Sequence, residues 1–126
     1  MEVISTLNLE IELIKEIHKS KSLTVTKNQS ILKSGDIAKF VPIVINGSLR
    51  VFYKDKKLKK EILLYNVIQN QICFSSYISV IKNNSSRVFI VAGKKSKLIL
   101  ISKNSILSWQ EKYKSWNEFI IKNYIN

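Results

Sequence analysis

The sequence has little of the residue types that build metal centres and covalent crosslinks. Cys73 and His18 are the only cysteine and the only histidine among 126 residues. One cysteine excludes an internal disulfide, a four-cysteine iron–sulfur cluster and a structural zinc knuckle. One histidine excludes the multi-imidazole metal sites of small-barrel enzymes. We therefore expect no metal and no cofactor, and we expect the Cys73 thiol to be buried and inert.

Long apolar runs are also missing. No stretch of about 18 consecutive apolar residues occurs, which excludes an ordinary transmembrane helix. The first part of the chain alternates charged and apolar positions and contains no signal-peptide core. A hydrophobic content of 45% fits one domain, residues 1–126, with its own core. These features predict a soluble, cytoplasmic protein without a membrane partner.

Acidic residues are few, since 9 Asp and Glu stand against 21 Lys and Arg and give a formal net charge of +12. Such a surface can bind nucleic acid by releasing counterions from phosphate. Arginine, however, reads base edges best, and it occurs only at Arg50 and Arg87. We therefore interpret most lysines as solvated. A free-standing basic module that binds nucleic acid or an acidic protein through 54–60 and 94–97 remains the alternative function.

Short β-patterned runs fill the middle of the chain and are separated by turn residues. They cover 23–26, 30–33, 41–46, 49–54, 60–65, 87–92 and 97–102. Asn46-Gly47 lies between the third and fourth runs and predicts a β-hairpin with a tight primed turn. The lysine-rich segment 54–60 predicts a solvated hairpin tip, because it has no glycine to shape a phosphate-binding loop.

Helical periodicity occurs at both ends of the chain and in one short insert. The predicted helices are an amphipathic one over 4–19, one or two turns over 75–81, and a closing helical region from 103 onward. The residues expected to cap them are Ser5 or Thr6, Ser75 or Ser76, and Asn104 or Ser105. The predicted fold class is α+β: a double-stranded β-helix, or jelly-roll-like β-roll, with helices packed outside.

An aromatic and aliphatic stripe follows the closing region at spacings of three and four residues. It comprises Ile106, Trp109, Tyr113, Trp116, Ile120 and Tyr124. We expect Trp109 to anchor the core. Two interpretations stay open for Trp116, Ile120 and Tyr124: they pack into the core, or they form the seam of a homodimer.

The order of elements, together with several short motifs, resembles a known family. The matching segments are Gly35-Asp36, 41–53 with Asn46-Gly47, the strand over 60–65, Ser85-Ser86-Arg87 with the residues up to Ala92, and 98–102. They resemble the cyclic nucleotide-binding domain of the Crp/Fnr superfamily of bacterial regulators. The resemblance spans nearly the whole chain and implies a ligand-sensing or dimerisation domain of a transcriptional regulator. DNA would then be bound only through a helix-turn-helix domain that is absent from this chain.

The segment that holds the cyclic phosphate in that family departs from the pattern here. Family members use a Gly-Glu dipeptide, a short helix and an Arg-Ser/Thr-Ala run. No Asp or Glu occurs between Glu61 and Glu111, so the expected acceptor for the ribose hydroxyl is missing. We therefore expect that cyclic AMP is not bound in the usual way. A small anionic ligand or nucleotide is still compatible with a candidate anion pocket made of Phe74, Ser75, Ser76, Ser85, Ser86 and Arg87.

Whether the candidate pocket can bind an anion depends on the direction of the Arg87 side chain. In this sequence the arginine follows its serines, and a shift of one residue on a strand turns a side chain to the opposite face. We favour an outward Arg87 that acts as a surface or interface charge, and an inward Arg87 that meets an anion is the alternative. An enzymatic function is not expected, because the carboxylates fall outside the apolar strands.

Overall fold

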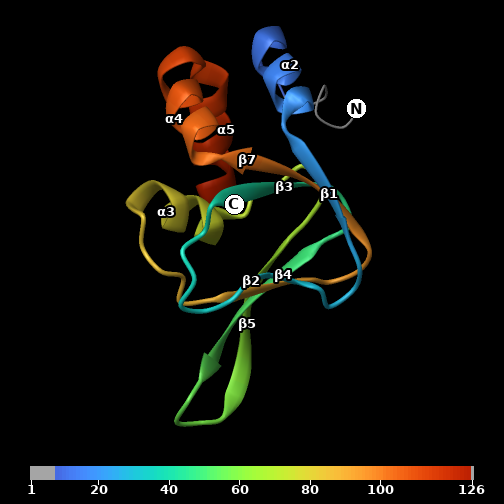
Figure 1. The fold of residues 1–126 in the computed structure, drawn as a ribbon, viewed down its shortest axis with the longest axis vertical. Helices are drawn as coiled ribbons and strands as arrows, with labels where there is room; N and C mark the ends of the chain where they lie inside the picture. Colours follow the sequence, from blue (N-terminus) through green and yellow to red (C-terminus); the bar gives the residue numbers. More distant parts are fainter. Residues whose placement is uncertain (1–7, 126) are drawn as a thin grey trace.

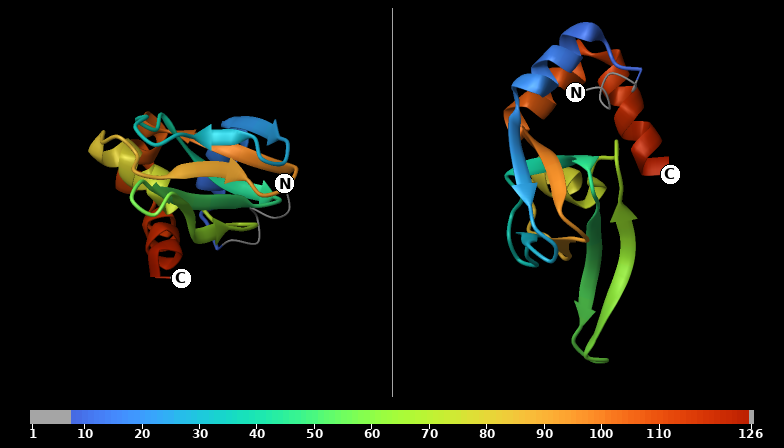
Figure 2. Two further views of the ribbon diagram at one scale, coloured as in Figure 1. Left: turned by 90° about the horizontal axis from the view of Figure 1, so that it is seen from below. Right: turned by 90° about the vertical axis from the view of Figure 1, so that its right-hand side faces the viewer.

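The computed structural model describes residues 8–125 as a β-roll with most helices at one end and one helix at its side (Figures 1 and 2). The helices are α2 (Ile11–Lys19), α3 (Phe74–Lys82), α4 (Lys103–Lys112) and α5 (Lys114–Ile125). The strands are β1 (Lys21–Val25), β2 (Ser30–Leu32), β3 (Phe40–Asn46), β4 (Leu49–Asp55), β5 (Lys60–Val67), β6 (Phe89–Ala92) and β7 (Ser96–Ser102). The predicted α+β roll is confirmed, although the expected caps Ser5 and Thr6 lie outside the described residues.

Two antiparallel sheets face each other. One has the order β1-β7-β3 and the other the order β2-β6-β4-β5. Both alternating faces of β3 and β7 are apolar, as expected for strands covered on two sides. One face packs toward the second sheet and the other toward the helices, so that the core is continuous. Its largest fully buried side chains include Trp109, Trp116, Ile43, Ile99 and Ile101.

The prediction of a β-hairpin at Asn46-Gly47 is wrong. β3 pairs with β7, whereas β4 pairs with β5 and β6, so the dipeptide turns a corner from one sheet to the other. Gly47 does adopt the positive φ that the dipeptide favours, 100°. The corner is fixed by a second crossing at 93–96: the Ser48 N–H donates to the Ser96 hydroxyl (3.0 Å) and the Gly93 N–H to the Ser48 carbonyl (2.9 Å).

The hairpin tip predicted over 54–60 is confirmed. It joins β4 to β5 and projects from the roll at the end opposite the helices (Figure 1, green). The Asp55 carboxylate accepts hydrogen bonds from the N–H groups of Lys57 and Leu58, at 2.9 and 3.0 Å, and so closes the turn. The lysines between Asp55 and Glu61 are exposed, which agrees with a solvated tip.

Two of the predicted helix caps are corrected. α3 begins earlier than expected, at Phe74, so its N-cap is Cys73 rather than Ser75 or Ser76. α4 is capped by the Ser102 hydroxyl, which accepts from the Ser105 N–H, rather than by Asn104 or Ser105. The predicted closing region is two helices, because the chain turns extended at Tyr113. Sequence periodicity continues through Tyr113, so it could not reveal the break.

The position of α3 depends on the outer edge of β3. Pro42 lies in this edge strand, where its lack of an N–H costs no ladder hydrogen bond, and its carbonyl accepts from the Cys73 N–H at 3.0 Å. Two residues further along β3, the Val44 N–H donates to the Gln71 carbonyl, also at 3.0 Å. The segment before α3 is thereby fastened to β3, and the start of the helix is held beside the roll.

Candidate functional site

A cavity of about 610 Å³ lies between α3 and the segment 84–88. We call it the cationic cavity. Its lining comprises Phe74, Ser75, Ile78, Ser79, Lys82, Asn84, Ser85, Ser86, Arg87 and Val88. Five of the six residues of the candidate anion pocket therefore come together here. The sixth, Ser76, faces a different cavity.

The serine hydroxyls of the cationic cavity differ in whether they are already hydrogen-bonded within the chain. The Ser79 hydroxyl donates to the Asn84 carbonyl and accepts from the Ala38 N–H, and the Ser86 hydroxyl is bonded to both the N–H and the carbonyl of Val88. These two hydroxyls shape the walls. Ser85, by contrast, is exposed and forms no side-chain hydrogen bond with any residue in 8–125. Ser85 is therefore the hydroxyl that is free to meet a ligand.

Arg87 lines the cationic cavity and is exposed to solvent. The argument that a register shift turns it outward does not apply, because β6 begins only at Phe89 and Arg87 lies in a bend. The Ser86 hydroxyl closes that bend with its two hydrogen bonds to Val88. Within the described chain Arg87 has no carboxylate partner. Its guanidinium is thus available to a ligand.

The charge of this cavity has one sign. Among residues 8–125, Lys82 and Arg87 are the only charged side chains of its lining, and no carboxylate lines it. Lys82 was missed by the sequence prediction, although it lies seven residues after Ser75, two helical turns further along α3, on the same helix face. An anionic group that enters the cavity would meet two cations and the Ser85 hydroxyl without electrostatic repulsion.

The first turn of α3 already has an internal partner, the phenol of Tyr65 on β5. The Tyr65 oxygen accepts from the Ser75 N–H at 3.1 Å and lies 2.5 Å from the Ser75 hydroxyl. Burial raises the pKa of Tyr65, and the neighbouring Cys73 thiol adds to this effect, so the phenol stays neutral at physiological pH. A neutral phenol therefore caps one of the helix N–H groups that would otherwise attract an anion.

A β-bulge explains why Tyr65 points to α3. The pairing of β4 with β5 slips between Val51, which pairs with Tyr65, and Phe52, which pairs with Leu63. Leu64 is the extra residue. Leu63 and Leu64 are consequently both exposed, whereas Tyr65 joins Ile62 on the inner face of the strand. A strict alternation read from the sequence cannot reveal such a residue, so Tyr65 was not predicted.

Cys73 is fully buried beside the first turn of α3. Burial raises the pKa of its thiol, with the Ser76 and Ser75 groups opposing the effect less strongly. A buried thiol with a raised pKa is a poor nucleophile. No group of three or more His, Cys, Asp or Glu side chains placed to hold a metal occurs in residues 8–125.

The three residues of the candidate dimer seam do not share one environment. Trp116 and Ile120 are buried within this chain, whereas the side chain of Tyr124 is 68% exposed. The Trp116 ring meets the Trp109 ring edge to face, with centroids 5.0 Å apart. Tyr124 packs on Phe74 at the start of α3, with ring centroids 4.7 Å apart. The homodimer itself stays a prediction, and its contact would involve Tyr124 rather than the two buried residues.

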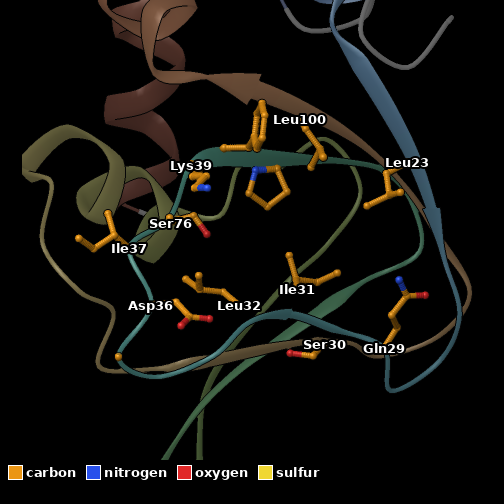
Figure 3. Close-up of a pocket in the computed structure, with 14 residues that line it drawn as sticks. Leu23, Gln29, Ser30, Ile31, Leu32, Asp36, Ile37, Lys39, Ser76 and Leu100 are labelled. Carbon is orange, nitrogen blue, oxygen red and sulfur yellow. The ribbon is translucent and has the colours of Figure 1, made fainter.

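A second cavity, of about 720 Å³, lies between the two sheets, and the sequence prediction missed it (Figure 3). We call it the inter-sheet cavity. It is lined by Leu23, Gln29, Ser30, Ile31, Leu32, Gly35, Asp36, Ile37, Ala38, Lys39, Phe40, Pro42, Ser76 and Leu100. All three strands of the first sheet contribute to its wall, and β2 lies opposite. Most of these residues lie between positions 23 and 42, and only the fold brings Ser76 and Leu100 to them.

Comparisons with known proteins identify the fold. No family model and no curated protein matches this sequence. Among solved structures, the catabolite activator protein of Thermus thermophilus aligns over 94% of this chain with a TM-score of 0.74 and 14% identity. A transcriptional regulator of Thermotoga maritima aligns over 88% with a TM-score of 0.71 and 24% identity. The cAMP-bound EAL enzyme Bd1971 aligns over 70% with a TM-score of 0.64 and 22% identity.

This chain spans 84% of the Thermotoga structure, 53% of the Thermus protein and 22% of the EAL enzyme. None of the described helices is long and apolar enough to cross a membrane. The likeness extends over both sheets and the helices beside them, since it covers nearly all of the chain in the Thermus comparison. The chain therefore has the β-roll fold found in Crp/Fnr-type regulators, and the resemblance inferred from its sequence is confirmed at the level of the fold.

Proposed function

We propose that this chain is a ligand-sensing domain of a transcriptional regulator and that its ligand carries an anionic group. The observation that supports this function best is the cationic cavity, which combines Arg87 and Lys82 with the free hydroxyl of Ser85 and contains no acid. Guanidinium and ammonium groups bind carboxylates and phosphates through charge-assisted hydrogen bonds. The shared fold with transcription regulators supports the regulatory role.

Cyclic AMP is not the expected ligand, although the EAL enzyme has been solved with it bound. In the part of the chain that the structure describes, no carboxylate lines the cavity to accept a hydrogen bond from a ribose hydroxyl. The first turn of α3 is also occupied, since the Ser75 N–H already bonds to Tyr65. A cyclic phosphate would have to displace this phenol. A ligand whose anion stays at the Arg87 and Lys82 end of the cavity would leave the cap intact.

A physical route from the cavity to the end of the chain runs through Phe74. This residue lines the cationic cavity and packs on Tyr124 of α5. A ligand that moves the start of α3 would therefore change the surface presented by α5, where Ile121 and Tyr124 are exposed. If α5 contributes to a homodimer, ligand binding would bias its geometry.

Isothermal titration of the chain with inorganic pyrophosphate, cyclic AMP and cyclic GMP tests this function. We expect saturable pyrophosphate binding that Arg87→Ala weakens roughly tenfold or more, since a charge-assisted hydrogen bond contributes about 1.5–3 kcal/mol. Lys57→Ala, on the distant hairpin tip, is the matched control and should leave binding unchanged. Micromolar saturable binding of cyclic AMP would contradict the proposed loss of cyclic nucleotide recognition.

A second function is favoured by the position of the hairpin tip. The exposed lysines at 56, 57, 59 and 60 project from the roll on the β4–β5 hairpin, away from the helices. Such a protrusion could bind nucleic acid or an acidic protein. Filter binding to duplex and single-stranded DNA at several salt concentrations tests it, because phosphate contacts make binding weaken steeply with salt. Absence of any salt-sensitive retention would exclude this function.

A further inference from the structure

The inter-sheet cavity has the size of a small-molecule site. Its volume of about 720 Å³ lies within the range of roughly 300–1,000 Å³ typical of ligand pockets. It is separate from the cationic cavity, because the two lie on different sides of α3: Ser75 lines the cationic cavity, whereas Ser76 lines the inter-sheet cavity. Figure 3 shows its side chains arranged around a space bounded above by β3 and β7 and below by β2.

Apolar side chains make up most of its wall. Leu23, Pro42 and Leu100 come from three adjacent strands of one sheet, and Ile31 faces them from β2. At its margin the side chains of Ile37 and Phe40 are 47% and 39% exposed. Apolar surface that remains in contact with water is unfavourable. Occupation by an apolar molecule would remove that cost.

One polar group lies deep in this apolar wall. Ser76 is only 2% exposed, and Figure 3 shows its hydroxyl directed toward the space. Within residues 8–125 the Ser76 hydroxyl forms no hydrogen bond with another side chain or with the backbone, so it is free to bond to a ligand. The nearby serines 79 and 86 are, by contrast, fully engaged with the backbone. A buried hydroxyl that forms no hydrogen bond is uncommon.

The charges around the cavity balance. Asp36 and Lys39 are its only charged lining residues, they have opposite signs, and both are exposed. Figure 3 draws Lys39 near Ser76, but this lysine is exposed to water. An anionic group placed beside Ser76 would lose hydration and gain only a solvent-screened attraction to Lys39. The deep end of the cavity therefore suits an uncharged group.

We propose that the inter-sheet cavity binds a small, uncharged, apolar molecule that carries one hydroxyl group. The hydrocarbon body packs between Leu23, Ile31 and Leu100, and the hydroxyl donates a hydrogen bond to the Ser76 oxygen. An aliphatic or alicyclic body fits best, since Phe40 is the only aromatic residue of the lining and lies at its margin. This site does not depend on the anion site proposed above.

Cyclohexanol is a suitable probe, and backbone amide chemical shifts in two-dimensional NMR are a suitable measurement. We expect saturable shifts at Ile31, Ser76 and Leu100. Ser76→Ala should weaken binding about fivefold, the value of one ordinary hydrogen bond of about 1 kcal/mol. Ile31→Glu, which places a charge on the half-exposed wall, should abolish it. Arg87→Ala is the matched control: it removes the cationic cavity's guanidinium and should leave cyclohexanol binding unchanged.

Three results would overturn the site. The first is the absence of saturable shifts up to the solubility limit of cyclohexanol. The second is an affinity of the Ser76→Ala and Ile31→Glu variants that equals that of the parent chain. The third is a set of shifts confined to Phe74, Ile78 and Arg87. Because the substituted side chains could affect folding, near-ultraviolet circular dichroism of each variant must match that of the parent chain. The pyrophosphate titration of the same variants separates this outcome from failure of the anion site.

Discussion

The hydroxyl of Tyr113 donates a hydrogen bond to the carboxylate of Glu16, 97 residues earlier in the chain. The bond joins α2 to the break between α4 and α5. It raises the pKa of Tyr113 to about 12 and lowers the pKa of Glu16 below its usual value. Next to it, the Ser115 N–H and hydroxyl both donate to the Glu10 carboxylate, at 3.2 and 2.7 Å. The two ends of the described chain are thus tied to each other by polar groups.

The Glu16–Tyr113 bond should stabilise the fold only between acidic and strongly alkaline pH. Because the pKa of Tyr113 is higher in the folded chain, its contribution is complete below its unfolded value near 10 and disappears as the pH rises toward about 12. Because the pKa of Glu16 is lower in the folded chain, its contribution is complete above about 4.5 and is lost as the pH falls further. Both groups are partly solvated, so the total effect is small.

Urea unfolding of the parent chain and of Tyr113→Phe at a series of pH values tests this prediction. The difference in unfolding free energy should be constant, and below about 1 kcal/mol, across the neutral range. It should shrink toward both extremes. Tyr53→Phe, which removes a hydroxyl without a hydrogen bond to the described residues, is the control. A difference that does not vary with pH would contradict the assignment.

Tyr65→Phe should loosen the start of α3. Its phenol accepts from the first-turn N–H of Ser75, so we expect a loss of about 1 kcal/mol in unfolding free energy, similar to removal of a helix cap. The same change frees that N–H for an anion. Pyrophosphate should therefore bind the Tyr65→Phe variant more tightly than the parent chain. Equal or weaker binding would show that the phenol does not compete with the ligand.

Gly47→Ala should be much more destabilising than Gly35→Ala. Both glycines have a positive φ, 100° and 97°, so both substitutions strain the backbone. An added Cβ at Gly47 would lie 2.0 Å from the Ser96 hydroxyl oxygen, whereas at Gly35 no atom lies within 4 Å. We expect about 1 kcal/mol for Gly35→Ala and clearly more for Gly47→Ala, measured by urea unfolding. Equal losses would mean that the corner between the sheets relaxes freely.

Trp116 and Tyr124 should separate core packing from dimerisation. Trp116→Ala empties a fully buried site and should cost about 3–5 kcal/mol of unfolding free energy. Tyr124→Ala should cost less than about 1 kcal/mol, because most of its side chain is exposed. If α5 forms a dimer seam, sedimentation equilibrium should show weaker association for Tyr124→Ala. Unchanged association, or a parent chain that is monomeric throughout, would remove Tyr124 from any such contact.

The sequence predicted the elements of this fold better than their partners. The strand and helix ranges from residue 8 onward follow from alternation and helical period, and most agree with the structure to within a few residues. The partner of β3 could not be predicted, because Asn46-Gly47 favours a turn regardless of whether the next strand stays in the same sheet. The actual partner, β7, lies about fifty residues further on and carries no complementary signal.

The candidate site was predicted in part for similar reasons. Ser75, Ser85 and Arg87 were found because they stand where the family that this sequence resembles places its phosphate-binding segment, and the fold brings them together. Tyr65 was missed because the bulge at Leu64 reverses the alternation of β5, and Lys82 because it looked like a solvated helix end. The inter-sheet cavity arises from strands whose individual patterns are those of ordinary core strands, so only their packing reveals it.

The corner at Gly47 has a consequence for the order in which the chain can fold. Among the described strands, β1 and β3 form ladders only with β7, so no ladder of the first sheet can form until residues near 96–102 are available. During synthesis β1 and β3 remain unpaired until β7 is made, whereas the β4–β5 hairpin can form locally. A high sequence separation of contacts of this kind slows folding. The local hairpin is therefore a natural nucleus, and the last strand of the roll completes the first sheet in a single late step.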